Sequence, residues 1–306
     1  MSAIGVLVMA YGGPRSLDDI GPYLRDVRSF RETPQAAIDE VKRRYELIGG
    51  RSPILQRTEE QAAALGRVLR AGGGDFDSIV GMRHWHPYIS DALARLEERG
   101  IRRAVGLVMA PHYSHMSIGA YFDEVKDAQS KVEIAAVEEW HLLPAYINAV
   151  VERVRAAVER FPEAVRDQVP VIFTAHSLPE RILSWDDPYP AQLRATVDAL
   201  MEVLGPRTHR LAYQSAGMSK EPWLGPDVGE VMVSLADAGC RHVLVAPIGF
   251  VAEHVEILYD VDIALREEAR GRGVQLERIE MLNDSPTLIA GLAQLVRRRA
   301  EEAGWL

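Results

Sequence analysis

Short apolar runs alternate along the chain with longer segments whose apolar residues recur at helical spacing. The short runs are rich in Val, Ile and Leu, and their apolar residues do not alternate strictly with polar ones. This pattern is typical of strands buried on both faces of a parallel sheet. It predicts strands at residues 4–9, 78–82, 104–110, 132–137, 169–174, 209–213, 242–247 and 274–279.

Local signals place helices between these runs. Pro34 suits the first position of a helix that the Gly49-Gly50 pair ends. Thr58 and Gln61 have the spacing of a capping box and predict the start of the next helix. An apolar stripe at helical spacing supports that helix: Leu65, Val68 and Leu69.

The alternation of strands and helices indicates right-handed βαβ units and an α/β fold. Four predicted strands precede residue 140 and four follow it. The simplest arrangement is two similar Rossmann-like, doubly wound domains, each with a four-stranded parallel sheet. We expect them at residues 1–139 and 140–284.

Composition narrows the class of protein. The formal net charge of the 306 residues is −9, which argues against nucleic acid as a partner, because such binding depends on a basic surface. A single cysteine, Cys240, leaves no disulfide framework and no cysteine-ligated iron–sulfur cluster. No apolar run approaches the roughly 18 residues of a membrane span, and the first residues lack the basic start of a signal peptide. We therefore expect a cytoplasmic protein without stable membrane insertion.

Histidine and aromatic residues gather where predicted strands end. Ligands of open α/β sheets bind beyond the carboxyl ends of the strands. His112 and His115 are as consistent with capping or core positions as with a site, and we interpret His86 as a helix-entry residue and His209 and His242 as structural. The overall concentration suits a large aromatic ligand and a metal. The residues concerned include Tyr11, His84, Trp85, His112, Tyr113 and His176.

A second candidate feature is the acidic segment at residues 252–264, which has the pattern of a helix start. Glu256 and Asp260 are four residues apart and share one helix face, where like charges repel unless a cation or a proton separates them. A solvated acidic face at a helix start is the plainer interpretation. The apolar run at 246–250 just before it favours a buried carboxylate instead, which makes Glu256 with His176 a candidate metal or proton site.

The residues at these positions closely resemble the ferrochelatase family. The resemblance runs from about residue 4 to the end of the chain, and its motifs are long and in the family's order. They are Thr174-Ala175-His176-Ser177-Leu178-Pro179-Glu180, Gln214-Ser215 followed by Pro222-Trp223-Leu224-Gly225-Pro226, Gly249-Phe250 followed by Glu253-His254-Val255-Glu256 and Tyr259-Asp260, and Tyr45 followed by Ile48-Gly49-Gly50-Arg51-Ser52-Pro53.

The resemblance implies a porphyrin cleft between the two domains, with His176 and Glu256 as catalytic and metal-binding residues. It also implies that a C-terminal helix at about 285–306 returns to the first domain. Further cleft candidates are His84, Trp223 and Asp260. The implied porphyrin-binding residues are Tyr11, Arg28, Arg44, Tyr45, Ser52 and Tyr121.

The implied activity is that of a lyase of haem biosynthesis, which inserts Fe²⁺ into a porphyrin and releases two pyrrole protons. The chain lacks the C-terminal extension that carries an iron–sulfur cluster in some members, so we expect no tightly bound cofactor, with iron as a substrate. The compact bacterial type that it resembles implies coproporphyrin III as substrate, a monomer, and a downstream haem-synthesis enzyme as a possible partner. Ala264 stands where some relatives have a further carboxylate, which leaves an outer metal site open.

Other functions remain open on the sequence. Protoporphyrin IX is the alternative substrate. A cobalt or nickel chelatase would share the fold, and a non-catalytic haem carrier would use Tyr11 and His176 as ligands without needing Glu256. A two-domain solute-binding protein is the remaining alternative, against which the absence of a signal peptide argues.

Overall fold

A computed structural model describes residues 3–217, 219 and 221–306. It contains two four-stranded parallel sheets, which confirms the predicted α/β fold. The chain divides into two compact units. Unit 1 comprises Met1–Trp140, Ala252–Val255 and Asn283–Leu306, and unit 2 comprises His141–Val251 and Glu256–Leu282.

The sheet of unit 1 has the strand order β2-β1-β3-β4, and all its neighbours are parallel. The central strand β1 is buried along its whole length, as its continuous apolar run predicts. The carboxyl ends of β1 and β2 lie side by side, because Ala10 pairs with Met82. The four strands are β1 (Ile4–Ala10), β2 (Phe76–Met82), β3 (Arg103–Val108) and β4 (Glu133–Val137).

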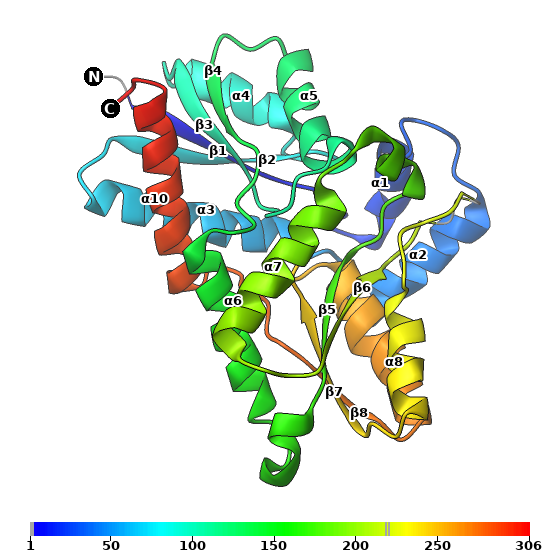
Figure 1. The fold of residues 1–306 in the computed structure, drawn as a ribbon. Helices are drawn as coiled ribbons and strands as arrows, with labels where there is room; N and C mark the ends of the chain where they lie inside the picture. The colour runs from blue at the N-terminus through cyan, green and yellow to red at the C-terminus, as the bar shows by residue number, and fades with distance from the viewer. Residues whose placement is uncertain (1–2, 218, 220) are drawn as a thin grey trace. The chain divides into compact units, whose positions relative to one another are not determined.

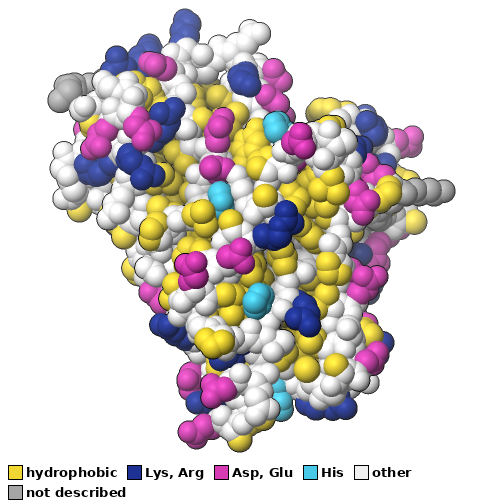
Figure 2. Space-filling model, in the orientation of Figure 1, with side chains coloured by type: hydrophobic (Ala, Val, Ile, Leu, Met, Phe, Trp, Pro, Cys, Tyr) yellow, Lys and Arg dark blue, Asp and Glu magenta, His cyan; other side chains and the backbone are white. Residues whose placement is uncertain are grey.

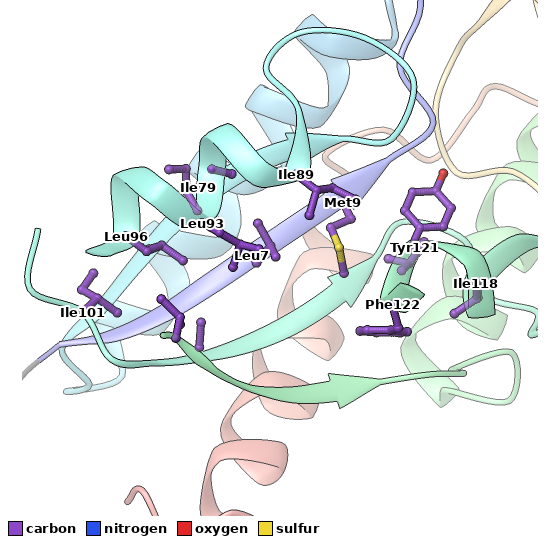
Figure 3. Close-up of a cluster of buried hydrophobic side chains, with 14 residues drawn as sticks. Leu7, Met9, Ile79, Ile89, Leu93, Leu96, Ile101, Ile118, Tyr121 and Phe122 are labelled. Atoms are coloured by element: carbon purple, nitrogen blue, oxygen red, sulfur yellow. The ribbon is translucent and has the colours of Figure 1, made fainter. Parts of the chain in front are cut away.

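Helices cover both faces of this sheet (Figure 1). On one face α4 packs on β2 and β1 and beside α5, and an apolar cluster that includes Leu7, Met9 and Leu93 fills this side of the sheet (Figure 3). On the other, α3 packs on β1 and β2 while α10 packs on α3, β3 and β4. The helices of unit 1 are α1 (Ile20–Val27), α2 (Gln35–Leu47), α3 (Ile54–Ala71), α4 (Ile89–Glu98), α5 (Ala120–Asp127) and α10 (Pro286–Glu302), with short turns η1 (Leu17–Asp19) and η2 (His115–Gly119).

Two local predictions in unit 1 were wrong. The capping box at Thr58 does not exist, because α3 already begins at Ile54 and the Thr58 hydroxyl donates to the Ile54 carbonyl inside the helix. Gln61 instead donates its side-chain amide to the Asn283 carbonyl, a contact with a segment far along the chain. Val68 is 41% exposed, so it does not belong to the buried stripe.

The start of α2 also differs from the expectation. Pro34 precedes the helix with an extended ψ of 139°, so it is not the first helical residue. The Gly49-Gly50 pair does follow the helix end, and both residues have positive φ values of 99° and 81°. Glycine adopts this left-handed conformation without steric cost, which explains the stop.

The sheet of unit 2 has the equivalent order β6-β5-β7-β8 and is also parallel. At its carboxyl edge His176 of β5 pairs with Gln214 of β6. The strands are β5 (Val171–His176), β6 (His209–Gln214), β7 (His242–Pro247) and β8 (Gln275–Arg278). The helical segments are α6 (Pro144–Val158), η3 (Glu163–Gln168), η4 (Glu180–Trp185), α7 (Tyr189–Leu204), α8 (Val228–Asp237), η5 (Glu256–Leu265) and α9 (Arg266–Gly271).

The segment around residue 256 departs from the sequence prediction in two ways. The helix expected at 252–264 begins at Glu256, and its turns are those of a π-helix, with hydrogen bonds five residues apart. Residues Ala252–Val255 belong to unit 1, where Glu253 forms an ion pair of 2.8 Å with Arg57.

The distribution of charged side chains on the surface agrees with the acidic net charge of the chain. On the face seen in Figure 2, acidic and basic side chains are interspersed with apolar ones and form no continuous basic field. None of the helices in the described part of the chain has the length and apolarity needed to cross a bilayer.

Candidate active site

The carboxyl edge of the unit 2 sheet brings together the two residues singled out as catalytic candidates. His176 is the last residue of β5, and Glu256 is the first residue of η5. His176 Nδ1 lies 2.9 Å from Glu256 Oε2. Both side chains are partly exposed, at 34% and 28%. The pair is therefore a charge-assisted hydrogen bond within reach of solvent and ligands.

The charges around His176 favour its protonated form. Burial acts to lower its pKa, but the charge of Glu256, the hydrogen bond to Glu256 and the charge of Asp260 together raise the pKa above its ordinary value. A raised pKa makes His176 a stronger base than an ordinary imidazole.

Asp260 lies in the same π-helix and is held by a neighbouring strand. The Ser215 hydroxyl, just beyond β6, donates to Asp260 Oδ2 at 2.5 Å. Glu256 and Asp260 therefore both act electrostatically on His176 from the same helix, whose turns are wider than those of the expected α-helix.

Trp223, another cleft candidate, is held close to the chain segment after β6. Its indole Nε1 donates to the Ser219 hydroxyl at 3.2 Å, and its backbone bridges to Pro179 beyond β5. A Cβ at Gly217 would lie 2.5 Å from the indole ring, so only glycine permits this packing. A ligand contact for Trp223 stays a prediction.

In unit 1, Tyr11 and His84 lie together at the ends of β1 and β2. The His84 backbone N–H donates to the Tyr11 carbonyl at 2.9 Å, and the two ring centroids are 4.6 Å apart. Tyr11 is 39% exposed, whereas His84 is buried. The tyrosine ring thus rests on the imidazole and keeps an accessible side.

The partners of His84 were not predicted from the sequence. Its Nδ1 lies 2.8 Å from Asp26 Oδ1 of α1, and the Tyr88 hydroxyl donates to the other oxygen of Asp26 at 3.2 Å. Burial and the charge of Arg83 lower the pKa of His84 and outweigh the opposing effect of Asp26. The lowered pKa favours the neutral form of His84. The pKa of Tyr88 is raised to about 12 by burial and by Asp26, so Tyr88 keeps its hydroxyl proton.

The two predicted carboxylate-binding arginines differ in their surroundings. Arg28 is exposed at the end of α1. Arg44 forms an ion pair of 3.0 Å with Glu40, one turn earlier in α2, and Arg43 pairs with the same carboxylate. Hydrogen bonds from Arg43 and Arg44 lower the pKa of Glu40, so this group is ionised and competes for Arg44.

Of the remaining predicted porphyrin-binding residues, Tyr45 and Tyr121 are buried and Ser52 is partly exposed. Tyr45 and Tyr121 are only 2% and 6% exposed. Tyr121 belongs to the apolar cluster of unit 1, but its hydroxyl points away from that cluster (Figure 3). Ser52 donates its backbone N–H to the Pro14 carbonyl, and the absence of a side chain at Gly13 makes room for it. Ligand contacts by these three residues stay predictions.

The other histidines occupy varied surroundings. His112 is buried and His115 is exposed. His86 is exposed beside Asp91 near the start of α4, while His209 and His242 each pack against a phenylalanine ring. Across residues 3–217, 219 and 221–306, no group of three or more His, Cys, Asp or Glu side chains is arranged to hold a metal ion.

Solved structures with the same architecture are chelatases. SirB from Bacillus subtilis with Fe³⁺ aligns with a TM-score of 0.59 at 10% identity, covering 99% of this chain and 98% of that chain. CbiX, described as the terminal enzyme for siroheme biosynthesis in denitrifying bacteria, aligns with a TM-score of 0.58 at 12% identity, covering 96% of this chain and 98% of that one. These similarities define a chelatase-like fold.

Sequence comparison identifies the family within this fold. The ferrochelatase family model matches residues 3–300. A ferrochelatase of Deinococcus radiodurans is 42% identical over 98% of this chain and 96% of its own length. A coproporphyrin III ferrochelatase of Geobacillus kaustophilus is 40% identical over 98% and 97%, respectively. The chain belongs to the ferrochelatase family.

Proposed function

We propose that this protein is a lyase of haem biosynthesis that inserts Fe²⁺ into coproporphyrin III with release of two pyrrole protons. The observation that carries the proposal is the His176–Glu256 pair, at 2.9 Å, on the carboxyl edge of a sheet in a ferrochelatase-family chain. Relatives named coproporphyrin III ferrochelatase, including one from Bacillus subtilis at 36% identity, support coproporphyrin III as the substrate.

The pair supplies a route for pyrrole protons. His176 Nδ1 faces Glu256, which leaves Nε2 as the nitrogen that meets the substrate. His176 must first release its Nε2 proton to solvent, which leaves a neutral imidazole whose Nδ1–H faces Glu256. A pyrrole N–H bond then breaks as an Nε2–H bond forms, and the Glu256 carboxylate stabilises the resulting imidazolium. Loss of that Nε2 proton to solvent restores the acceptor, and the second pyrrole proton follows the same route. Imidazole and carboxylate also suit Fe²⁺ as ligands during its transfer, so both residues are proposed as metal ligands.

The substrate's carboxylates require local positive charge in a chain of net charge −9. We propose that Arg28 and Arg44 bind them, since guanidinium groups pair with carboxylates through two parallel hydrogen bonds. Tyr11, resting on His84, presents an accessible aromatic face for the porphyrin ring. Arg44 must exchange Glu40 for the substrate in order to act.

The proposal needs no resident cofactor, since iron enters as a substrate. We propose a cytoplasmic monomer that hands its product to a later enzyme of haem synthesis; the single cysteine, Cys240, accords with a reducing compartment. The molar mass of the purified protein in solution, measured by light scattering, tests the monomeric state.

The decisive experiment is anaerobic Fe²⁺ insertion, followed by loss of porphyrin fluorescence, with coproporphyrin III and protoporphyrin IX side by side. We expect faster turnover of coproporphyrin III and near-complete loss of insertion in His176→Ala. His209→Ala, which changes a histidine at the opposite end of a strand, is the matched control and should retain activity. Preference for protoporphyrin IX would refute coproporphyrin III as the substrate, and tight haem binding without iron insertion would indicate a haem carrier.

A further inference from the structure

We propose that Thr174 and Gln214 are positioning residues, which hold the first residue of η5 so that Glu256 meets His176. The inference rests on the proposed function, because it concerns the rate of the same reaction. The contact that carries the inference reaches the Glu256 backbone and not its carboxylate. Their contacts form a chain from β5 through β6 to η5, all within unit 2.

The chain of contacts begins inside the sheet. Gln214 lies directly beside His176 in the parallel register of β5 and β6. The Gln214 side-chain amide Nε2 donates to the Glu256 backbone carbonyl at 3.0 Å. Gln214, at the end of β6, is therefore both the strand neighbour of His176 and the hydrogen-bond donor that holds the Glu256 backbone.

Thr174 fixes which way the Gln214 amide faces. The Thr174 hydroxyl donates to Gln214 Oε1 at 2.7 Å, and the exposed fractions of the two residues are 0% and 1%. Because the hydroxyl binds the amide oxygen, the amide NH₂ must face the Glu256 carbonyl. Buried polar networks of this kind fix one arrangement when every member is satisfied.

The next residue adds a second attachment to the same helix. Ser215 donates its hydroxyl to Asp260, one turn further along η5. Its φ of 58° is in the left-handed region, which non-glycine residues seldom adopt. Such a conformation persists only where surrounding contacts determine it, and it is frequent at functional sites. Gln214 and Ser215 thus hold η5 at Glu256 and at Asp260.

A π-helical turn needs such attachment because its geometry is less favourable than that of an α-helix, and π turns are frequent at functional sites. If Gln214 were free to rotate, the backbone at Glu256 would lose one of its fixed contacts. Displacement of a reacting group by about 1 Å can lower a rate by roughly 100-fold.

The test uses purified protein and compares kcat and KM for anaerobic Fe²⁺ insertion into coproporphyrin III. Thr174→Val keeps the shape of the side chain but removes the hydroxyl donor, and we expect kcat to fall about 10- to 100-fold with KM for the porphyrin changed less than about twofold. Thr174→Ser, which restores the donor, should recover most of kcat. Thr196→Val is the matched control, because Thr196 of α7 is equally buried in unit 2 and its hydroxyl donates to the His141 carbonyl. The kcat of this variant should stay at the wild-type value.

A second variant separates positioning from stability. Ser215→Gly relieves the left-handed backbone but removes the hydroxyl that holds Asp260, so we expect an unchanged or higher melting temperature together with a lower kcat. A structural role alone would move stability and activity in the same direction. Wild-type kcat in Thr174→Val, or an equal loss in Thr196→Val, would overturn the inference.

Failure of the proposed function would be recognised separately, because wild-type protein would then insert no iron. In that case the positioning role is read from the His176 imidazole signals in ¹⁵N-labelled protein. Thr174→Val should shift them and Thr174→Ser should restore them. Signals that are unchanged in Thr174→Val would overturn the inference without reference to activity.

Discussion

Breaking the ion pair between Arg278 and Asp262 by removing one partner should be strongly destabilising to unit 2. Arg278 at the end of β8 donates from Nε and from a terminal nitrogen to the two oxygens of Asp262, in η5, at 2.9 and 2.8 Å. Their side chains are 11% and 19% exposed. Removing one partner of a buried pair leaves an uncompensated charge and costs about 3–5 kcal/mol.

We expect Arg278→Met to lower the free energy of unfolding by about 2–3 kcal/mol, less than the full range, because Asp262 keeps some solvent and a distant contact with Arg266. Urea unfolding followed by circular dichroism measures the loss. The loosened η5 should also lower kcat for iron insertion. Arg266→Met is the control, since that pair is 3.5 Å long and the arginine side chain is 46% exposed, and it should cost less than about 0.5 kcal/mol.

The double variant Arg278→Met with Asp262→Leu distinguishes charge from packing. If the cost comes from the charge left on Asp262, replacing both partners by apolar side chains should recover at least about 1 kcal/mol relative to Arg278→Met alone. A double variant no more stable than the single one would refute the electrostatic reasoning. A loss below about 1 kcal/mol in Arg278→Met would refute the assigned burial of the pair.

Three further predictions follow from the site. Because the pKa of His176 is raised, its pairing with Glu256 stabilises the fold fully below the ordinary value of 6.5, and this stabilisation is lost as pH rises through the folded-state pKa. The stability difference between wild type and His176→Asn should therefore shrink from pH 6 to pH 9 in urea titrations. A constant difference would contradict the raised pKa. Arg44→Ala should raise KM for coproporphyrin III far more than it lowers kcat, whereas Glu40→Gln should lower KM by removing a carboxylate that competes for Arg44; unchanged KM values would count against a carboxylate-binding role. Asp26→Asn should cost about 1–3 kcal/mol of stability at pH 8, measured by urea unfolding, because it replaces a charged acceptor of the His84 hydrogen bond; a loss under 0.5 kcal/mol would show that the bond contributes little.

The regular elements were largely predictable because their signals are local. The buried strand β1 follows from one uninterrupted apolar run, and the end of α2 follows from two adjacent glycines that adopt positive φ. The capping box at Thr58 failed because the same local pattern also fits the interior of a helix. What decides there is a tertiary contact, the hydrogen bond between Gln61 and the Asn283 carbonyl.

In the candidate site, too, some features were predictable from the sequence and others were not. His176 and Glu256 were found from motifs and from the rule that parallel strands present ligands at their carboxyl ends, and the structure places them 2.9 Å apart. Asp26 was missed because nothing in a short amphipathic helix marks one carboxylate as the partner of a histidine 58 residues later. The π-helical turns of η5 were missed because the segment was interpreted with α-helical geometry, and π turns are rare enough that a short sequence does not suggest them.

Two histidines with nearly identical partners show how the surroundings set their chemistry. His84 and His176 each place Nδ1 within 2.8–2.9 Å of a carboxylate, yet the pKa of His84 is lowered and that of His176 is raised. Burial opposes the charged form in both. Beside His84 the additional charge is the positive Arg83, which lowers the pKa further. Beside His176 it is the negative Asp260, which adds to the effect of Glu256 and raises the pKa. A neutral imidazole locked against Asp26 suits the support of the Tyr11 ring, whereas an accessible imidazole between two carboxylates can gain and lose a proton, which the proposed pyrrole chemistry requires.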